Sequence, residues 1–116
     1  MQPRWYLLLK GIIPDSTNKT PEEQVAMLPK EYEVPTTIAE MTKSVLVFRK
    51  TGTCPNLLRW AACAERMVKT DKLADAYVGN VSCIGYVNGN GLYISSWDGK
   101  RECSIGVGAS RKLRIL

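Results

Sequence analysis

The stretch Val81–Leu116 constrains the fold most, because short apolar segments alternate in it with Asn-Gly, Asp-Gly and Gly-Ala-Ser turns. Asn-Gly and Asp-Gly between apolar runs are strong signals of a β-hairpin, since both central residues of the tight turn need a positive φ. We therefore expect antiparallel turns at Asn88–Gly91 and at Asp98-Gly99, and a final strand from Lys112 to Leu116. The rest of the chain has to pack against this sheet.

The lengths of these turns decide which side chains share a face of the sheet. A two-residue turn at Asp98-Gly99 places Trp97 opposite Lys100 and Leu92 opposite Ile105, and an even-length turn at Asn88–Gly91 keeps the same alternation. One face then carries Val81, Cys83, Gly85, Val87, Leu92, Ile94, Cys103 and Ile105. The other face carries Ser82, Ile84, Tyr86, Tyr93, Ser95, Trp97, Lys100 and Glu102. Only an odd-length turn would reverse the assignment.

The second of these faces is too apolar for a sheet surface that simply meets water. A sheet with one solvated face shows a clean apolar and polar alternation, which Ile84, Tyr86, Tyr93 and Trp97 interrupt. Two interpretations follow. Another layer of the chain covers this face, or the face is an aromatic platform left open for a partner.

The N-terminal part of the chain predicts one strand and one short helix. The run Arg4–Ile13 is apolar at every position from Trp5 to Leu9, which is typical of a strand in the centre of a sheet. Thr20, followed by Pro and then by Glu23, has the pattern of a helix N-cap, and Pro29 ends that helix.

The middle of the chain predicts a second short helix, a strand and the main helix. Thr37 with Glu40 repeats the N-cap pattern, and the β-branched run Val45–Phe48 predicts a strand. The main helix is expected from Pro55 to about Lys69, with a continuation toward Tyr77 left open. Its apolar stripe would consist of Leu57, Ala61, Ala64 and Val68.

These elements predict an α+β fold with an antiparallel sheet, formed by the C-terminal meander and the N-terminal strand and packed on one main helix. The 116 residues suit a single domain over 1–116. No apolar run has the length of a membrane span, and the one after Arg4 is too short for a secretory signal. We therefore expect an intracellular, cytoplasmic protein that does not bind a membrane.

The residue types do not indicate an enzyme. The chain has no histidine, which excludes Ser/His/Asp and Cys/His nucleophile systems and removes the commonest metal ligand. Its four cysteines have no CxxC spacing, so neither a metal nor a cofactor is expected. Cys54, just before Pro55, is the one residue placed for activation at a helix N-terminus, and a reactive or an inert thiol both remain open.

The charge and the aromatic residues favour a binding function. Of the net charge of +5, residues 51–116 carry +4. Exposed aromatic and cationic side chains are typical anchors of protein interfaces, which favours a small inhibitor, adaptor or assembly protein, self-association included. The first alternative is nucleic-acid binding through aromatic stacking and a basic helix stripe, and the second is a small-molecule or nucleotide site. The predicted contact residues are Arg59, Arg66, Lys69, Tyr93, Trp97 and Lys100.

Overall fold

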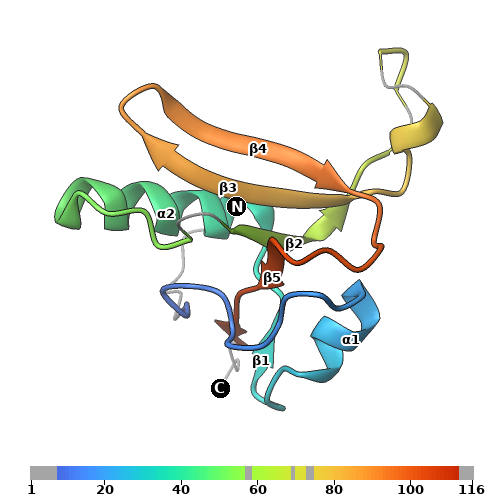
Figure 1. Ribbon diagram of the computed structural model, residues 1–116, viewed down its shortest axis with the longest axis horizontal. Helices are drawn as coiled ribbons and strands as arrows, with labels where there is room; N and C mark the ends of the chain where they lie inside the picture. Colours follow the sequence, from blue (N-terminus) through green and yellow to red (C-terminus); the bar gives the residue numbers. More distant parts are fainter. Residues whose placement is uncertain (1–7, 57–58, 69, 73–74, 113–116) are drawn as a thin grey trace.

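A four-stranded sheet forms the centre of the protein, and one long helix lies against it (Figure 1). The computed structural model describes residues 8–56, 59–68, 70–72 and 75–112. The fold is α+β, as predicted. Its elements are α1 (Pro21–Ala26), β1 (Tyr32–Glu33), α2 (Thr37–Thr51), β2 (Trp60–Arg66), the 3-10 helix η1 (Asp75–Tyr77), β3 (Val81–Asn88), β4 (Gly91–Trp97), β5 (Ile105–Val107) and β6 (Ser110–Arg111).

The strand order in the main sheet is β4-β3-β2-β5, and a separate small sheet pairs β1 with β6. β3 is antiparallel to both of its neighbours, whereas β5 lies parallel to β2. Parallel neighbours need a crossover connection rather than a tight turn. The sheet is therefore mixed, and its two edges are formed by β4 and β5.

Both helix starts follow from the local sequence. Glu23 donates its backbone N–H to the Thr20 hydroxyl, and the Glu23 carboxylate accepts the Thr20 N–H at 2.9 Å, so the predicted capping box of α1 is confirmed. α2 begins one residue earlier than the pattern indicated, because its N-cap is Thr36, whose hydroxyl accepts the Ala39 N–H at 3.2 Å. The helix ends at Gly52, which adopts the left-handed conformation.

The predicted main helix from Pro55 to Lys69 is wrong, because most of that segment is strand β2. Ala61, Ala62 and Cys63 are three consecutive buried residues, which suits a strand covered on both faces. The predicted strand Val45–Phe48 is also wrong, since it lies within the 15-residue helix α2. α2 buries polar side chains on its inner side, so it lacks the apolar stripe by which helices are recognised.

The predicted strand Arg4–Ile13 is not a central strand. Residues 4–7 lie outside the described part of the chain, and residues 8–13 form only an isolated bridge, from Leu8 to Ser110. The Leu9 N–H donates to the Ala109 carbonyl at 2.8 Å, and the Ile13 N–H donates to the Val107 carbonyl at 2.7 Å. The segment thus covers the outer edge of β5 instead of pairing in the middle of the sheet.

The second predicted hairpin, at Asp98-Gly99, is also wrong. Gly99 has the expected positive φ of 88°, but the chain does not return along β4. Residues 98–104 cross to the far side of β2, where Ile105 pairs with Trp60. The expected final strand from Lys112 to Leu116 lies, except for Lys112, outside the described part, and β6 precedes it at Ser110–Arg111.

The first hairpin is confirmed, but a bulge changes its faces. Asn88 pairs with Gly91 and Val87 with Leu92, so the turn is a two-residue one. Beyond the turn, Ile84 pairs with Ile94, which leaves one extra residue in β3. A one-residue shift moves every later side chain to the other face. The bulge therefore has the effect that an odd-length turn would have had.

Because of this shift, Trp97 lies opposite Val81 and belongs to the core. The apolar core cluster consists of Ala62, Val81, Cys83, Trp97 and Ile105, with Trp60 packed against it. The neighbouring Ser82 points to the other face, where its hydroxyl meets that of Thr37 at the start of α2, 3.0 Å away. The predicted register is thus wrong in β3, and the face predicted to be covered as a whole is covered only in part, because Trp97 is buried while Tyr93 on the same strand is exposed.

In the described part of the chain, no helix combines the length and the apolar character that crossing a membrane requires.

Candidate interaction surface

Strand β4 is an uncovered edge of the main sheet. It pairs with β3 on one side only, and within the described residues no other segment donates or accepts a backbone hydrogen bond along it. β5, at the opposite edge, is covered by residues 8–13. Figure 1 shows β4 as the uppermost strand of the sheet, with no strand beyond it. Such an edge presents a row of N–H and C=O groups to which another strand can bind.

The sequence of β4 lacks the usual protection of an edge strand. The strand is seven residues long, `GLYISSW`, and contains neither a charged residue nor a proline. Natural sheets protect their edges with lysines, prolines, bulges or very short strands. Here the bulge lies in the inner strand β3, while Tyr93 and Ile94 on β4 are 39% and 51% exposed. This edge is long enough and sufficiently apolar to accept a partner strand.

An aromatic pair marks the same edge. The rings of Tyr86, in the bulge of β3, and Tyr93, on β4, are 4.4 Å apart between centroids and inclined by 32°. The pKa of Tyr86 is raised above its usual range, chiefly by the charge that Tyr93 carries when ionised and also by a hydrogen bond between the two side chains. Tyr86 therefore remains neutral near pH 7, and the pair offers apolar ring surface and polar hydroxyls to a partner.

Of the predicted contact residues, Trp97 is not available on the surface. Its side chain is only 4% exposed, and its indole N–H donates to the Lys100 carbonyl at 2.7 Å. Trp97 therefore contributes to the core rather than to an open face. Tyr93 is the one predicted aromatic contact that the structure leaves exposed.

The predicted cations do not form one stripe. Arg59 and Arg66 are exposed, but they precede and end a strand instead of lying on a helix. Arg66 donates to the Gly79 carbonyl at 3.1 Å, at the end of the sheet where β2 pairs with Val81. Lys100 is exposed in the crossover after β4, and Lys69 lies outside the described residues. The aromatic pair and these cations therefore do not form a common platform.

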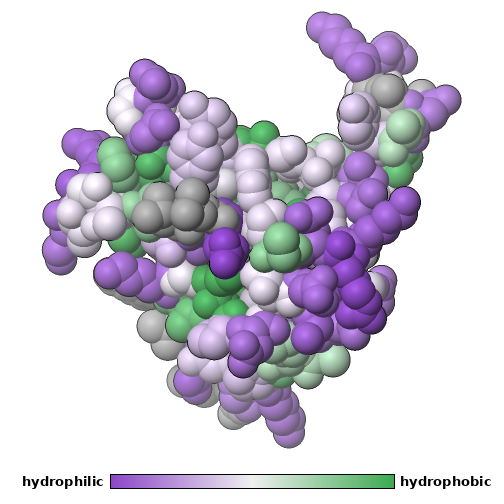
Figure 2. All heavy atoms as spheres, in the orientation of Figure 1, coloured by the Kyte–Doolittle hydropathy of each residue, from purple (hydrophilic) through white to green (hydrophobic). Residues whose placement is uncertain are grey.

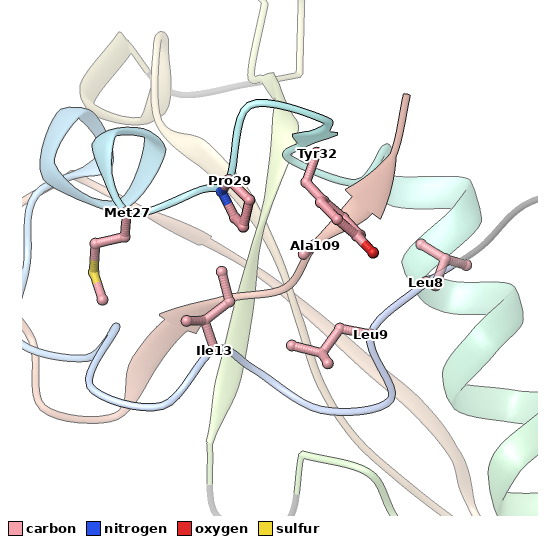
Figure 3. A pocket seen from close by; sticks show the side chains of 7 residues that line it. All are labelled: Leu8, Leu9, Ile13, Met27, Pro29, Tyr32 and Ala109. Atoms are coloured by element: carbon pink, nitrogen blue, oxygen red, sulfur yellow. The ribbon is translucent and has the colours of Figure 1, made fainter. Parts of the chain in front are cut away.

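A separate apolar pocket of about 480 Å³ lies between the N-terminal segment and the small sheet. Figure 3 shows the Leu9 and Ile13 side chains facing it from one side, with Pro29 and Tyr32 on the other. Figure 2 shows hydrophobic surface gathered over the N-terminal segment and mostly hydrophilic surface around it. The pocket is lined by Leu8, Leu9, Ile13, Met27, Pro29, Tyr32 and Ala109. The lining has no charged side chain, so it does not suit a nucleotide phosphate.

The thiols of the core are poor nucleophiles. Burial raises the pKa of both Cys63 and Cys83 to about 12, so both stay protonated at neutral pH. Cys103, which was predicted to share a face with the buried Cys83, is exposed, and all four cysteines are free. The described residues contain no group of three or more metal-ligating side chains that could hold an ion.

A buried polar cluster under α2 was not predicted from the sequence. It consists of Glu40, Lys43 and Ser44 on the helix and Asn56 in the loop before β2. Glu40 was considered only as part of a capping pattern, because its burial depends on loops that are distant in sequence.

Comparison of the chain with protein-family models, with curated proteins and with solved structures finds no match.

Proposed function

We propose that this protein is a non-enzymatic protein-binding module that takes up an extended segment of its partner along β4. The observation that supports this proposal is the uncovered seven-residue edge, which has no charged side chain and exposes Tyr93 and Ile94. The partner strand can come from a different protein or from a second copy of this chain.

The physical basis of the proposal is β-strand addition. A partner strand satisfies the free N–H and C=O groups of β4, and these main-chain hydrogen bonds provide affinity for almost any extended sequence. Specificity comes from the side chains, which alternate between the two faces. Tyr93, with Tyr86 beside it, contacts the partner on one face of the sheet, and Ile94 contacts it on the other.

Nucleic-acid binding has less support. The exposed cations Arg59 and Arg66 lie at opposite ends of β2, and β4 itself carries no cation to neutralise a phosphate. The protein partner is favoured because the aromatic pair adjoins an apolar, uncharged edge.

Changing Ile94 to lysine tests the proposal. A lysine on an edge strand opposes strand addition, since its charge has to be desolvated or turned away when a partner binds. We expect Ile94→Lys to weaken partner binding at least about tenfold, which corresponds to about 1.4 kcal/mol, while thermal unfolding changes little because the side chain is 51% exposed. Ile38→Lys is the matched control, since Ile38 is 52% exposed but belongs to helix α2 and not to the sheet edge.

The measurement compares the three proteins as baits in nuclease-treated extract of the source cells, quantified by mass spectrometry. Binding of each candidate partner is then measured with purified proteins, and light scattering tests self-association. Support requires a partner that wild type and Ile38→Lys bind and Ile94→Lys does not, with slower amide hydrogen exchange along β4 in the complex. Binding that is equal in all three proteins, or that nuclease abolishes, contradicts the proposal.

A further inference from the structure

The buried cluster under α2 brings an amine, an amide and a carboxylate together. The Lys43 amine donates to Glu40 Oε1 at 2.5 Å, and the Asn56 amide nitrogen donates to the same oxygen at 3.2 Å. The Lys43 amine also donates to the Leu9 carbonyl at 3.2 Å. Glu40, Lys43 and Asn56 are 1%, 8% and 2% exposed, so water has little access to any of them.

Three atoms of this cluster have no hydrogen-bond partner, Ser44 Oγ, Glu40 Oε2 and Asn56 Oδ1, of which the last two belong to the carboxylate and the amide. Their surroundings are tight, because a Cβ built on Gly108 would lie 3.3 Å from Glu40 Oε2 and one built on Gly11 would lie 3.8 Å from Asn56 Oδ1. Buried polar atoms are normally paired, since an unpaired one loses its bonds to water without compensation. Without a covalent link between its side chains, the polar atoms of the cluster therefore lack part of their hydrogen bonds.

We propose that Lys43 and Asn56 become joined by an amide bond between their side chains, with Glu40 as the catalytic residue. The carboxylate contacts both reacting groups, which is the position that a general base needs. The fold holds the amine and the amide against the same oxygen of Glu40, where water has little access, so their reaction is effectively unimolecular.

The reaction balances within the three side chains. Lys43 first gives one proton from its ammonium group to the Glu40 carboxylate, and the neutral amine attacks the Asn56 carbonyl carbon. A new C–N bond forms, and the bond from that carbon to the Asn56 amide nitrogen breaks. The leaving nitrogen takes the second amine proton and departs as ammonia, and Glu40 keeps the first proton as a neutral carboxylic acid. No oxidant or other reactant is needed.

The product satisfies two of the three atoms that lack partners, Glu40 Oε2 and Asn56 Oδ1. The new amide N–H donates to one oxygen of Glu40, and the protonated second oxygen of Glu40 donates to the new amide carbonyl. The reaction also replaces a buried ion pair, whose desolvation is costly, by neutral groups. The cross-link joins α2 to the loop before β2. It closes a loop in the chain and thereby lowers the conformational entropy of the unfolded state.

Intact-mass measurement of the denatured full chain tests the proposal. We expect wild type to be lighter than its sequence requires by one ammonia molecule, and Lys43→Arg to show no loss. Glu40→Gln, which cannot take the proton, should lose most of the cross-link. Asn56→Asp should lose water instead of ammonia and reach the same final mass as wild type, because both reactions yield the same amide.

Peptide mapping of the wild-type protein locates the bond whether or not the variants fold. A branched peptide that joins Lys43 to Asn56 supports the proposal. Two results would overturn it: a wild-type mass equal to that of the unlinked chain, or a loss of ammonia that maps to a cyclised Asn88-Gly89 and persists in Lys43→Arg.

Discussion

Replacing Trp97 with alanine is expected to lower the free energy of unfolding by about 3–5 kcal/mol, as large-to-small changes of buried aromatic residues do. The side chain is 4% exposed and packs with Val81, Cys83 and Ile105 in the core cluster. The change also leaves the Lys100 carbonyl without the indole N–H that it accepts at 2.7 Å. Denaturant unfolding followed by far-UV circular dichroism measures the effect.

Tyr93→Ala is the matched control, because it removes an exposed aromatic ring from the same strand. We expect it to cost less than about 1 kcal/mol, in the range of surface substitutions, while it weakens partner binding. If Trp97→Ala leaves stability unchanged and Tyr93→Ala does not, the assignment of the two rings to core and surface is wrong.

Gly106→Ala is expected to destabilise the protein by about 1–3 kcal/mol through overpacking. A Cβ at this position in β5 would lie 2.5 Å from Ile12 Cδ1 and 2.7 Å from Ser16 Oγ. Ser16 is buried, and its hydroxyl accepts the Val107 N–H at 3.0 Å, so it cannot move without losing that bond. The N-terminal segment would be displaced from the edge of the sheet.

Gly89→Ala provides the comparison, because nothing lies within 4 Å of a Cβ built there. Its effect should stay within about 0.5 kcal/mol. Limited proteolysis reports on the N-terminal segment directly, and cleavage between residues 9 and 16 should be faster in Gly106→Ala. Equal stability and equal cleavage of the two variants would show that the segment is not packed on β5.

The features that could be predicted from the sequence are those that local chemistry determines. Thr20 and Glu23 form the predicted capping box because both of its hydrogen bonds join residues three apart. The Asn88–Gly91 turn likewise depends on a few adjacent residues. The α+β class followed from such local signals.

The features that could not be predicted depend on burial and on distant contacts. Ala61, Ala62 and Cys63 have a spacing that also fits a helix, and only their burial between β3 and β5 makes them a strand. The length of α2 was underestimated because Glu40 and Lys43 are buried through hydrogen bonds to each other and to other segments. A polar side chain that will be buried looks like a surface residue in the sequence.

The interaction surface could be predicted only in part. Tyr93 was expected to be exposed, and it is. The position of β4 at the edge could not be foreseen, because it depends on the crossover of residues 98–104 to the far side of β2. The bulge near Tyr86 could not be foreseen either, and it moved Trp97 into the core.

Nuclear Overhauser contacts between strands test the central claim most directly, namely that β4 is an open edge because the chain crosses over after it. The structure predicts backbone contacts of Ala61 with Gly106 and of Ala62 with Val107. It predicts none between Leu92 and Ile105, which a hairpin at Asp98-Gly99 would pair. Contacts between Leu92 and Ile105 would mean that β5 covers β4, and the proposed binding edge would then not exist.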